Sequence, residues 1–390
     1  MSMVDNRLRE LRQRIPEAEP IDVAHAVRQG ALLIDIREPS EITGGSPIGA
    51  ERMVRGFLEM RIAQKAPDTA QPLYVMCASG ARSLLAADSL QALGYANVAS
   101  VKGGFGAWKQ FGLPFEVPVQ LSEADRQRYA RHLTIPEVGD AGQIKLLSSK
   151  VLLIGAGGLG SPTAFYLAAA GVGTIGLVDD DVVDQSNLQR QILHTEARVG
   201  RKKVESAREA LLALNSKITV NLHDVRLSAD NVEDIFDDYD VVVDGPDNFA
   251  TRYLINDACV KLGIPNVHAA VFRFEGYLTV YSPKAHSGPC YRCSYPNPPP
   301  AELAPSCADA GVLGVLPGVI GLLQAVETLK IVLGIGQPLL GRVLSYDALK
   351  GEFSEYEVEK NPHCGVCGVP QEQIRYQDIA EVCATEGVAA

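Results

Sequence analysis

The stretch VLLIGAGGLGSP, residues 151–162, limits the fold of this chain more than any other segment. It reads as an apolar strand, a G-x-G-x-x-G turn formed by Gly155, Gly157 and Gly160, and then a helix. Such a turn lets the backbone approach a phosphate, and the helix N-terminus favours negative charge. The next predicted strand ends at Asp179, where a carboxylate can bind a ribose hydroxyl. We therefore predict a nucleotide site; a tight strand–helix turn without a ligand is the alternative.

The apolar runs divide the chain into two blocks. Residues 1–118 alternate strand and helix patterns, and 112–118 reads as a linker that contains prolines. The second block contains KVLLIG, TIGLVD and DVVVDG as strands with helices between them, which predicts a parallel, doubly wound sheet. We expect an α/β chain with one domain over 1–118, of which 1–19 is an N-terminal extension, a second domain over 119–370, and a polar tail over 371–390.

Charge and hydropathy argue against two classes of partner. Residues 1–118 hold equal numbers of acidic and basic side chains, so the net charge of −11 lies in the remainder, and no basic face for nucleic acid is expected. Residues 310–336 are the most apolar, but they include a proline, a glutamine and two charged residues, which favours a buried helix over a membrane span. The charged N-terminus does not resemble a signal peptide, so we expect a cytoplasmic protein with reduced cysteines.

Basic residues and a further acidic residue near the glycine loop favour a triphosphate as the nucleotide bound there. Arg190 and Lys203 follow the loop within an otherwise acidic block, and the neighbouring Arg201 and Lys202 are expected on a solvated helix face. Asp247 follows the strand predicted at 240–245, at the edge of the sheet where open α/β folds bind their ligands. It could bind Mg²⁺ there, or it could cap the helix that begins near Asn248.

Four motifs in this order, GAGGLGS, SNLQRQ, VGRKKVESA and D-N-x-x-x-R, resemble the ubiquitin-activating-enzyme-like adenylyltransferases of the MoeB/ThiF type. The resemblance spans residues 120–368 and implies a Rossmann-like domain that uses ATP and Mg²⁺ to adenylate the C-terminal Gly-Gly carboxylate of a ubiquitin-like sulfur carrier. Asp247, Arg190 and Lys203 would be catalytic, with Asp247 on Mg²⁺. The ATP-binding residues it implies are Gly155, Gly157, Gly158, Gly160, Asp179, Asn187, Arg190, Lys203, Asp247, Asn248 and Arg131.

Two further residues are to be compared with the family pattern. Arg131 resembles an arginine that reaches the ATP site of a second subunit, which implies a homodimer. Pro246 departs from the pattern, because the family usually has a small hydroxyl residue at this position. That departure affects the local turn and leaves the acid at 247 in place.

The cysteines fall into distinct groups. Two C-x-x-C pairs supply four soft ligands for a closed, structural zinc site; a redox motif would need only one such pair at a helix N-terminus. The zinc ligands would be Cys290, Cys293, Cys364 and Cys367. Cys307 lies between the two pairs. The resemblance implies that a cysteine in this loop either bonds the carrier through an acyl-disulfide or takes no part in the chemistry.

The octapeptide MCASGARS places another cysteine, Cys77, at a strand–loop–helix junction, where backbone N–H groups favour a thiolate. The loop is Cys77, Ala78, Ser79, Gly80, Ala81 and Arg82. It is one residue shorter than the loop of cysteine phosphatases, and suits a single terminal sulfur. With LLIDIREPSE and KGGFGAW it makes residues 20–117 resemble a single-domain rhodanese, which implies a persulfide on Cys77. Arg82 and Arg37 could attract an anionic sulfur donor, although an acidic partner within the fold is expected first for Arg37.

Together the two resemblances predict an enzyme that adenylates a sulfur carrier and then transfers sulfur from the Cys77 persulfide to form a thiocarboxylate. The small subunit of molybdopterin synthase is the expected carrier; thiamine, cysteine and tRNA-thiolation carriers are alternatives. The sulfur donor would be a persulfide or thiosulfate. Two other functions stay open: a nicotinamide oxidoreductase on the same glycine loop, and a rhodanese domain that serves only for docking.

Overall fold

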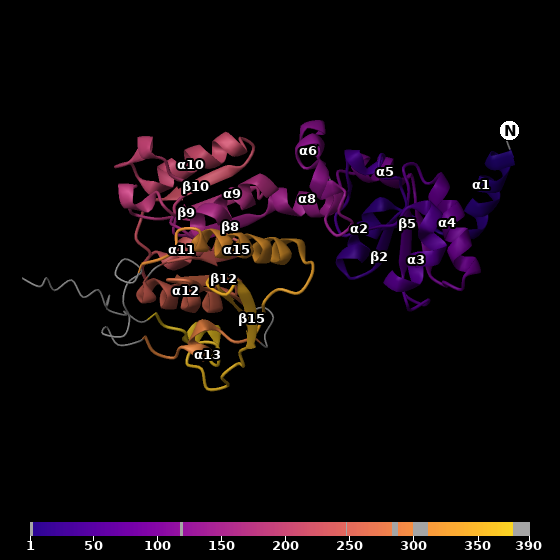
Figure 1. Ribbon diagram of the computed structural model, residues 1–390. Coiled ribbons are helices and arrows are strands. Elements are labelled where there is room, and N and C mark those ends of the chain that lie inside the picture. The colour runs from indigo at the N-terminus through magenta and orange to yellow at the C-terminus, as the bar shows by residue number, and fades with distance from the viewer. Residues whose placement is uncertain (1–2, 118–119, 247, 283–287, 299–310, 377–390) are drawn as a thin grey trace, which may run out of the picture. The chain divides into compact units, whose positions relative to one another are not determined.

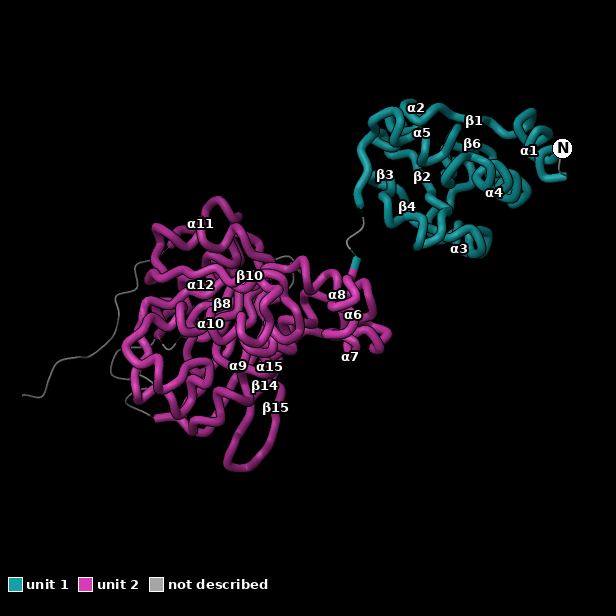
Figure 2. Tube along the Cα trace, turned by 90° about the horizontal axis from the view of Figure 1, so that it is seen from above, with its two compact units in different colours: residues 1–120 teal, residues 121–390 magenta. Residues whose placement is uncertain are grey.

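The computed structural model describes residues 3–117, 120–246, 248–282, 288–298 and 311–376. The chain forms two compact units, Met1–Gln120 and Leu121–Ala390 (Figure 2). Asp247 and Cys307, which the sequence assigns to chemistry, lie outside the described residues.

Unit 1 is a sheet of five short parallel strands with helices on both faces (Figure 1). The strand order is β1 (Glu17–Ala18), β6 (Val98–Val101), β5 (Leu73–Met76), β2 (Leu32–Asp35) and β4 (Glu51–Arg52). One face packs on α1 (Met3–Arg14), α3 (Leu58–Lys65) and α4 (Ala81–Ala92), and the other on α2 (Pro20–Arg28) and α5 (Gly104–Gln110). Alternate side chains of β2 and β5 therefore enter different cores, which is why residues 32–34 and 73–76 are apolar throughout.

The segment expected as a linker takes part in the fold of unit 1. Phe115–Glu116 forms β7, which pairs antiparallel with β3 (Ser46–Pro47). The Phe115 ring meets the Phe105 ring edge-on, with centroids 5.6 Å apart. Because β3 and β7 lie far apart in the sequence, the prolines that suggested a linker gave no sign of this pairing.

Unit 2 contains an eight-stranded mixed sheet. Its order is β10 (Thr219–His223), β9 (Thr174–Val178), β8 (Lys150–Ile154), β11 (Val241–Asp244), β12 (Asn266–Phe272), β13 (Glu275–Tyr281), β14 (Arg342–Asp347) and β15 (Glu352–Glu357). The first five strands are parallel, as the sequence predicts, and the pairs from β12 to β15 are antiparallel. The antiparallel extension was not predicted.

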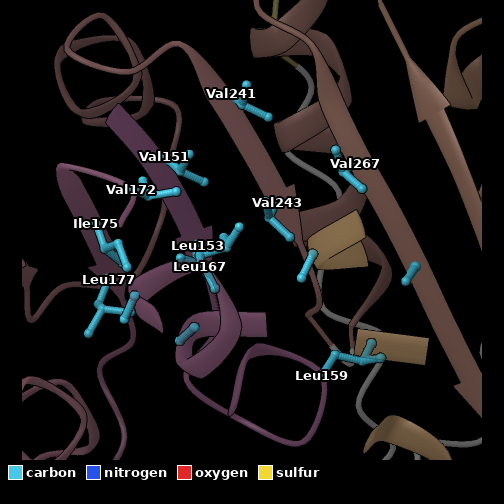
Figure 3. Packing of buried hydrophobic residues seen from close by; sticks show 14 of the residues in the cluster. Val151, Leu153, Leu159, Leu167, Val172, Ile175, Leu177, Val241, Val243 and Val267 are labelled. Atoms are coloured by element: carbon cyan, nitrogen blue, oxygen red, sulfur yellow. The ribbon is translucent and has the colours of Figure 1, made fainter. Parts of the chain in front are cut away.

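Helices cover both faces of the parallel part, so the sheet is doubly wound. One face carries α8 (Gly139–Ser148), α9 (Gly160–Ala170), α10 (Lys203–Leu214) and α15 (Leu316–Leu333), and the other carries α11 (Val232–Phe236) and α12 (Phe249–Leu262). Figure 3 shows part of the first core, which contains Val151 and Leu153 of β8, Val243 of β11 and Leu167 of α9. The unit begins with α6 (Glu123–Arg128) and α7 (Ala130–Leu133), and Cys290 precedes α13 (Tyr291–Ser294).

Among the described helices, α15 has the length and composition of a membrane span. Its Leu316, Ile320 and Ala325 belong to the core beneath the sheet. Gln324, which lies on the same face, donates hydrogen bonds from Nε2 to the carbonyls of Asp244 (2.8 Å) and Val267 (3.1 Å). These contacts are those of a helix buried against a sheet, the arrangement that the polar residues of this stretch predict.

Candidate functional site

In unit 2 the chain adds β9 and β10 on one side of β8 and then crosses to the other side to add β11 and β12. Ligands of open α/β sheets bind beyond the carboxyl ends of the strands at such a crossover point. The glycine loop follows β8, and Gly245 and Pro246 follow β11. A pocket lies between these two segments. The predicted residues that line it are Gly155, Gly157, Gly158, Asp179, Arg190 and Lys203.

Two glycines of the loop are required by its geometry. Gly155 has φ +96°, in the left-handed region that other residues avoid. A Cβ on Gly160 would lie 2.0 Å from the carbonyl oxygen of Gly155, because α9 starts directly against the end of β8. The turn therefore brings the helix N-terminus to the pocket, where its backbone N–H groups can meet phosphate oxygens.

The carboxylate of Asp179 is fixed at the end of β9. Its Oδ2 accepts a hydrogen bond from Ala156 N at 2.8 Å, and its Oδ1 accepts one from Asp181 N at 3.0 Å. Burial raises the pKa of Asp179 above its ordinary value, and the charge of Lys203 opposes that shift. The acid thus has an orientation set by backbone donors, as a residue that binds a ribose hydroxyl needs.

Lys203 begins α10 as a buried lysine, and its ammonium pairs with Asp181 at 2.7 Å. Arg190 lines the same pocket and donates to the carbonyl of Ser186 at 3.1 Å. Both cations therefore face the glycine loop, where they could meet a polyphosphate. Their neighbours on the solvated face behave as expected, since Arg201 pairs with Glu209 and Lys202 with Asp224.

Three other predicted ATP residues have different surroundings. The side chain of Asn187 caps a turn by accepting from Asp184 N at 3.0 Å, and it does not line the pocket. Asn248 caps α12 by accepting from Thr251 N at 2.8 Å, and it lines an adjoining pocket with Asp179. Arg131 is exposed on α7 and is not among the residues that line the pocket.

Sequence reasoning gave no role to Arg252 or His194, which support this site. Arg252 lines the pocket and donates two hydrogen bonds to the Pro246 carbonyl, at 3.1 and 3.2 Å, so the unusual proline stands in a turn that is held in place. His194 is buried, with Nε2 2.9 Å from the Ala156 carbonyl oxygen and Nδ1 2.9 Å from Ser206 Oγ. The position of Arg252 in the motif D-N-x-x-x-R could have indicated its role. The sequence contains no comparable signal for His194.

In unit 1, Cys77 directly follows β5 and is almost fully buried. The sulfur accepts from Gly80 N at 3.2 Å and Ser83 N at 3.4 Å, while Ser83 Oγ lies 3.5 Å away. Converging N–H groups at a helix N-terminus stabilise a thiolate and an attached charged atom.

The segment KGGFGAW shapes the cysteine loop from outside. Phe105 N donates to the Cys77 carbonyl at 2.8 Å, and Gly106 N donates to the Ala78 carbonyl at 3.0 Å. A Cβ on Gly104 would lie 2.3 Å from the Cys77 carbonyl oxygen. The two glycine-containing loops therefore form one rigid structure around the sulfur.

The two arginines of this unit have separate partners. Arg37 is buried and binds Asp35, with its NH2 nitrogen 2.6 Å from Oδ2, so its charge is used inside the fold. Ser46 Oγ donates to the same carboxylate at 2.8 Å. Arg82, at the end of the cysteine loop, forms a two-pronged pair with Glu41.

The four cysteines of the two C-x-x-C pairs converge in unit 2. Their sulfurs lie within 4.8 Å of one another, with Cys290–Cys364 at 3.6 Å and Cys293–Cys367 at 3.4 Å. A tetrahedral zinc with sulfurs at about 2.3 Å separates them by about 3.8 Å. The cluster fits such an ion. Ile374, which the sequence places in the tail, is buried against this cluster.

The structure thus contains a doubly wound α/β unit with a glycine-loop pocket and a smaller α/β unit with a buried cysteine at the start of a loop. Residues 129–366 match the model of the ThiF family, and residues 12–111 match the rhodanese-like domain. The chain belongs to the ThiF family and carries a rhodanese-like domain in addition.

The chain is also similar to individual proteins of known name. Probable adenylyltransferase/sulfurtransferase MoeZ of Mycobacterium tuberculosis is 47% identical over 274 residues, which cover 69% of each chain. A sulfur carrier protein adenylyltransferase of Thermus thermophilus is 48% identical over 268 residues, 68% of this chain and 99% of its own. A crystal structure of E. coli MccB with AMPCPP and MccA has a TM-score of 0.56 and 25% identity, covering 64% of this chain and 75% of the other.

Proposed function

We propose that the ThiF-family unit adenylates the C-terminal carboxylate of a ubiquitin-like sulfur carrier that ends in Gly-Gly. The carboxylate attacks the α-phosphorus of ATP, pyrophosphate leaves, and an acyl-adenylate forms. The attacking carboxylate is already ionised, so the protein contributes positioning and neutralisation of charge and needs no general base. Arg190 and Lys203 would neutralise the phosphates and Asp179 would bind the ribose.

The rhodanese-like unit would supply the sulfur. A persulfide on Cys77 attacks the carbonyl carbon of the acyl-adenylate, AMP leaves, and the carrier is joined to Cys77 through an acyl-disulfide. A second thiol then attacks the Cys77 sulfur, so that the thiocarboxylate leaves and a disulfide remains. Cys307 is a candidate for that thiol within the chain.

One observation carries this proposal. The same chain has a pocket lined by a glycine loop and basic side chains, and a cysteine whose sulfur accepts hydrogen bonds from two backbone N–H groups. The ThiF match speaks against the nicotinamide alternative, and the geometry at Cys77 speaks against a domain that only docks. The names of the relatives, which include a sulfur carrier protein adenylyltransferase, support the substrate class. The small subunit of molybdopterin synthase is our first choice of carrier.

Metals, assembly and compartment complete the proposal. Asp247 would bind the Mg²⁺ that neutralises ATP, and the four-cysteine cluster would hold a structural zinc with no open position for catalysis. Arg131 would reach the ATP site of a second copy in a homodimer. The described cysteines are free, which suits a reducing cytoplasm.

One experiment tests both halves together. The protein is mixed with ATP, thiosulfate and each candidate carrier in turn: those of molybdopterin, thiamine, cysteine and tRNA-thiolation pathways. Mass spectrometry then detects exchange of one carboxylate oxygen for sulfur on the carrier.

Two variants separate the steps. Cys77→Ala should abolish thiocarboxylate formation and leave ATP–pyrophosphate exchange unchanged. Asp247→Ala should abolish the exchange and leave thiosulfate:cyanide sulfur transfer intact. A Cys77→Ala protein that makes thiocarboxylate at the normal rate would refute the proposed role of the cysteine, and loss of both activities in either variant would refute the division of labour.

A further inference from the structure

The arginine of the cysteine loop is already neutralised by a carboxylate. The Arg82 NH1 nitrogen lies 2.7 Å from Glu41 Oε2, and its NH2 nitrogen lies 2.5 Å from Oε1, a two-pronged pair between residues 41 positions apart. Both side chains are partly exposed, 39% for Arg82 and 32% for Glu41. The pair therefore lies where solvent and a sulfur donor can approach the loop.

Glu41 is held in this position by more than its partner. Its Oε2 also accepts from Glu38 N at 3.0 Å, and its backbone carbonyl accepts from the Arg37 guanidinium at 3.3 Å. Arg82 and the Glu38 N–H lower the pKa of Glu41 to about 2, so it stays charged at neutral pH. The Arg37 guanidinium is itself anchored to buried Asp35. The carboxylate is thus preorganised, unlike most surface ion pairs.

This arrangement leaves little positive charge for an anionic donor. Arg37 is committed to Asp35 inside the fold, and Arg82 to Glu41. The carboxylate of Glu38 also acts electrostatically on Arg82. A donor that approaches Cys77 past Arg82 therefore meets one cation and two acids.

We propose that Glu41 is a specificity-determining residue that selects against small dianionic sulfur donors, such as thiosulfate, and favours donors that present an uncharged or singly charged persulfide. The inference rests on the proposed sulfur transfer at Cys77. A dianion loses the attraction of Arg82 and is repelled by the carboxylate, whereas a persulfide on a cysteine brings no sulfonate to the loop.

Both donors give the same product by balanced steps. With thiosulfate, the Cys77 thiolate attacks the outer sulfur, the S–S bond breaks, and sulfite leaves with the electron pair. With a persulfide RSSH, the thiolate attacks the terminal sulfur and RS⁻ leaves. Only the first reaction brings a dianion to Arg82 and releases one there.

The test compares Glu41→Gln with the wild type in the full chain. Formation of the Cys77 persulfide is followed by intact-protein mass spectrometry, with thiosulfate or cysteine persulfide as the donor. We expect the ratio of kcat/KM for thiosulfate to that for cysteine persulfide to rise about three- to ten-fold, and the gain to shrink at high ionic strength. Glutamine keeps an oxygen for the guanidinium, so unfolding temperature should change little.

Glu59→Gln is the matched control. Glu59 pairs with Arg55 at 2.6 Å and is 33% exposed, but it belongs to α3 and lies outside the loop. It should leave the donor ratio unchanged. An unchanged or reduced ratio in Glu41→Gln, or an equal rise in Glu59→Gln, overturns the inference. Persulfide loading of Cys77→Ala would instead overturn the proposed function itself.

Discussion

His194 joins the glycine loop to α10, and replacing it should weaken ATP binding more than it weakens turnover. The imidazole is 5% exposed and makes two hydrogen bonds of 2.9 Å, to the Ala156 carbonyl and to Ser206 Oγ. The phenylalanine of His194→Phe fills a similar volume but leaves the Ala156 carbonyl and the Ser206 hydroxyl without their hydrogen bonds to the imidazole. Each buried polar group left unpaired costs about 1–3 kcal/mol. With two such groups, we expect unit 2 to lose about 2–6 kcal/mol of stability.

Part of that loss should fall on the nucleotide. The Ala156 peptide is held from both ends, since its carbonyl contacts His194 and its N–H donates to Asp179. Freeing the carbonyl lets the glycine turn, the proposed phosphate site, rotate. If about 1.4 kcal/mol is lost from the bound state, KM for ATP rises about ten-fold. In ATP–pyrophosphate exchange we expect this rise with kcat within about two-fold, and in a thermal melt a decrease of about 2–4 °C for each kcal/mol.

His194→Gln is the conservative control, because an amide can donate to the Ala156 carbonyl and accept from the Ser206 hydroxyl. It should recover most of the affinity for ATP. It also removes a titration. Burial lowers the pKa of His194 below its usual 6.5, so the unfolded chain binds the proton more readily than the folded one. The stability that His194 contributes is therefore complete above pH 6.5 and is lost as the pH falls below it, a loss that the glutamine variant should not show.

The reasoning about His194 would be refuted by either of two results. In one, His194→Phe lowers the melting temperature but leaves KM for ATP unchanged, which would restrict the histidine to packing. In the other, the glutamine variant loses as much ATP affinity as the phenylalanine variant, which would mean that the two hydrogen bonds do not position the loop.

Two further predictions concern the cysteine sites. Gly104→Ala should reduce persulfide formation at Cys77 at least about ten-fold, because its Cβ would meet the Cys77 carbonyl at a φ of +56°; ATP–pyrophosphate exchange should be unchanged, and sulfur transfer at the normal rate would contradict this. Metal analysis should find about one zinc per chain, and its chelation should lower the melting temperature of unit 2. A fully stable, fully active protein without zinc would exclude a structural role.

The parts of the site that the sequence predicted are those built from local spacing. A strand, a glycine turn and a helix lie within residues 151–162, so their geometry follows from neighbouring residues. Asp179 could be predicted because the end of its strand is recognisable in the sequence. Lys203 could be predicted because it lies in a basic motif at the start of a helix. These residues do meet in one pocket. The doubly wound sheet could be predicted for the same reason, from apolar strands alternating with helices.

What sequence reasoning missed depends on contacts between distant segments. Glu41 and Arg82 are 41 positions apart, and no periodicity connects them. Asn187 belongs to a recognisable motif, yet its oxygen caps a turn, and only the folded backbone shows which use it has. The antiparallel strands that extend the sheet begin with β13, whose partner β14 lies beyond α15 along the chain. Pairings of that length are not encoded in local patterns.

The described residues around Cys77 and those around the glycine-loop pocket belong to different units. The sulfur of Cys77 receives its hydrogen bonds from Gly80 and Ser83, while the residues that line the nucleotide pocket all belong to Leu121–Ala390. In the proposed reaction, the carboxylate activated at the pocket of the second unit therefore has to meet a persulfide formed on Cys77 of the first unit. Mixing Cys77→Ala with Asp247→Ala should restore thiocarboxylate formation if sulfur can pass between chains, whereas no recovery would require both sites on one chain.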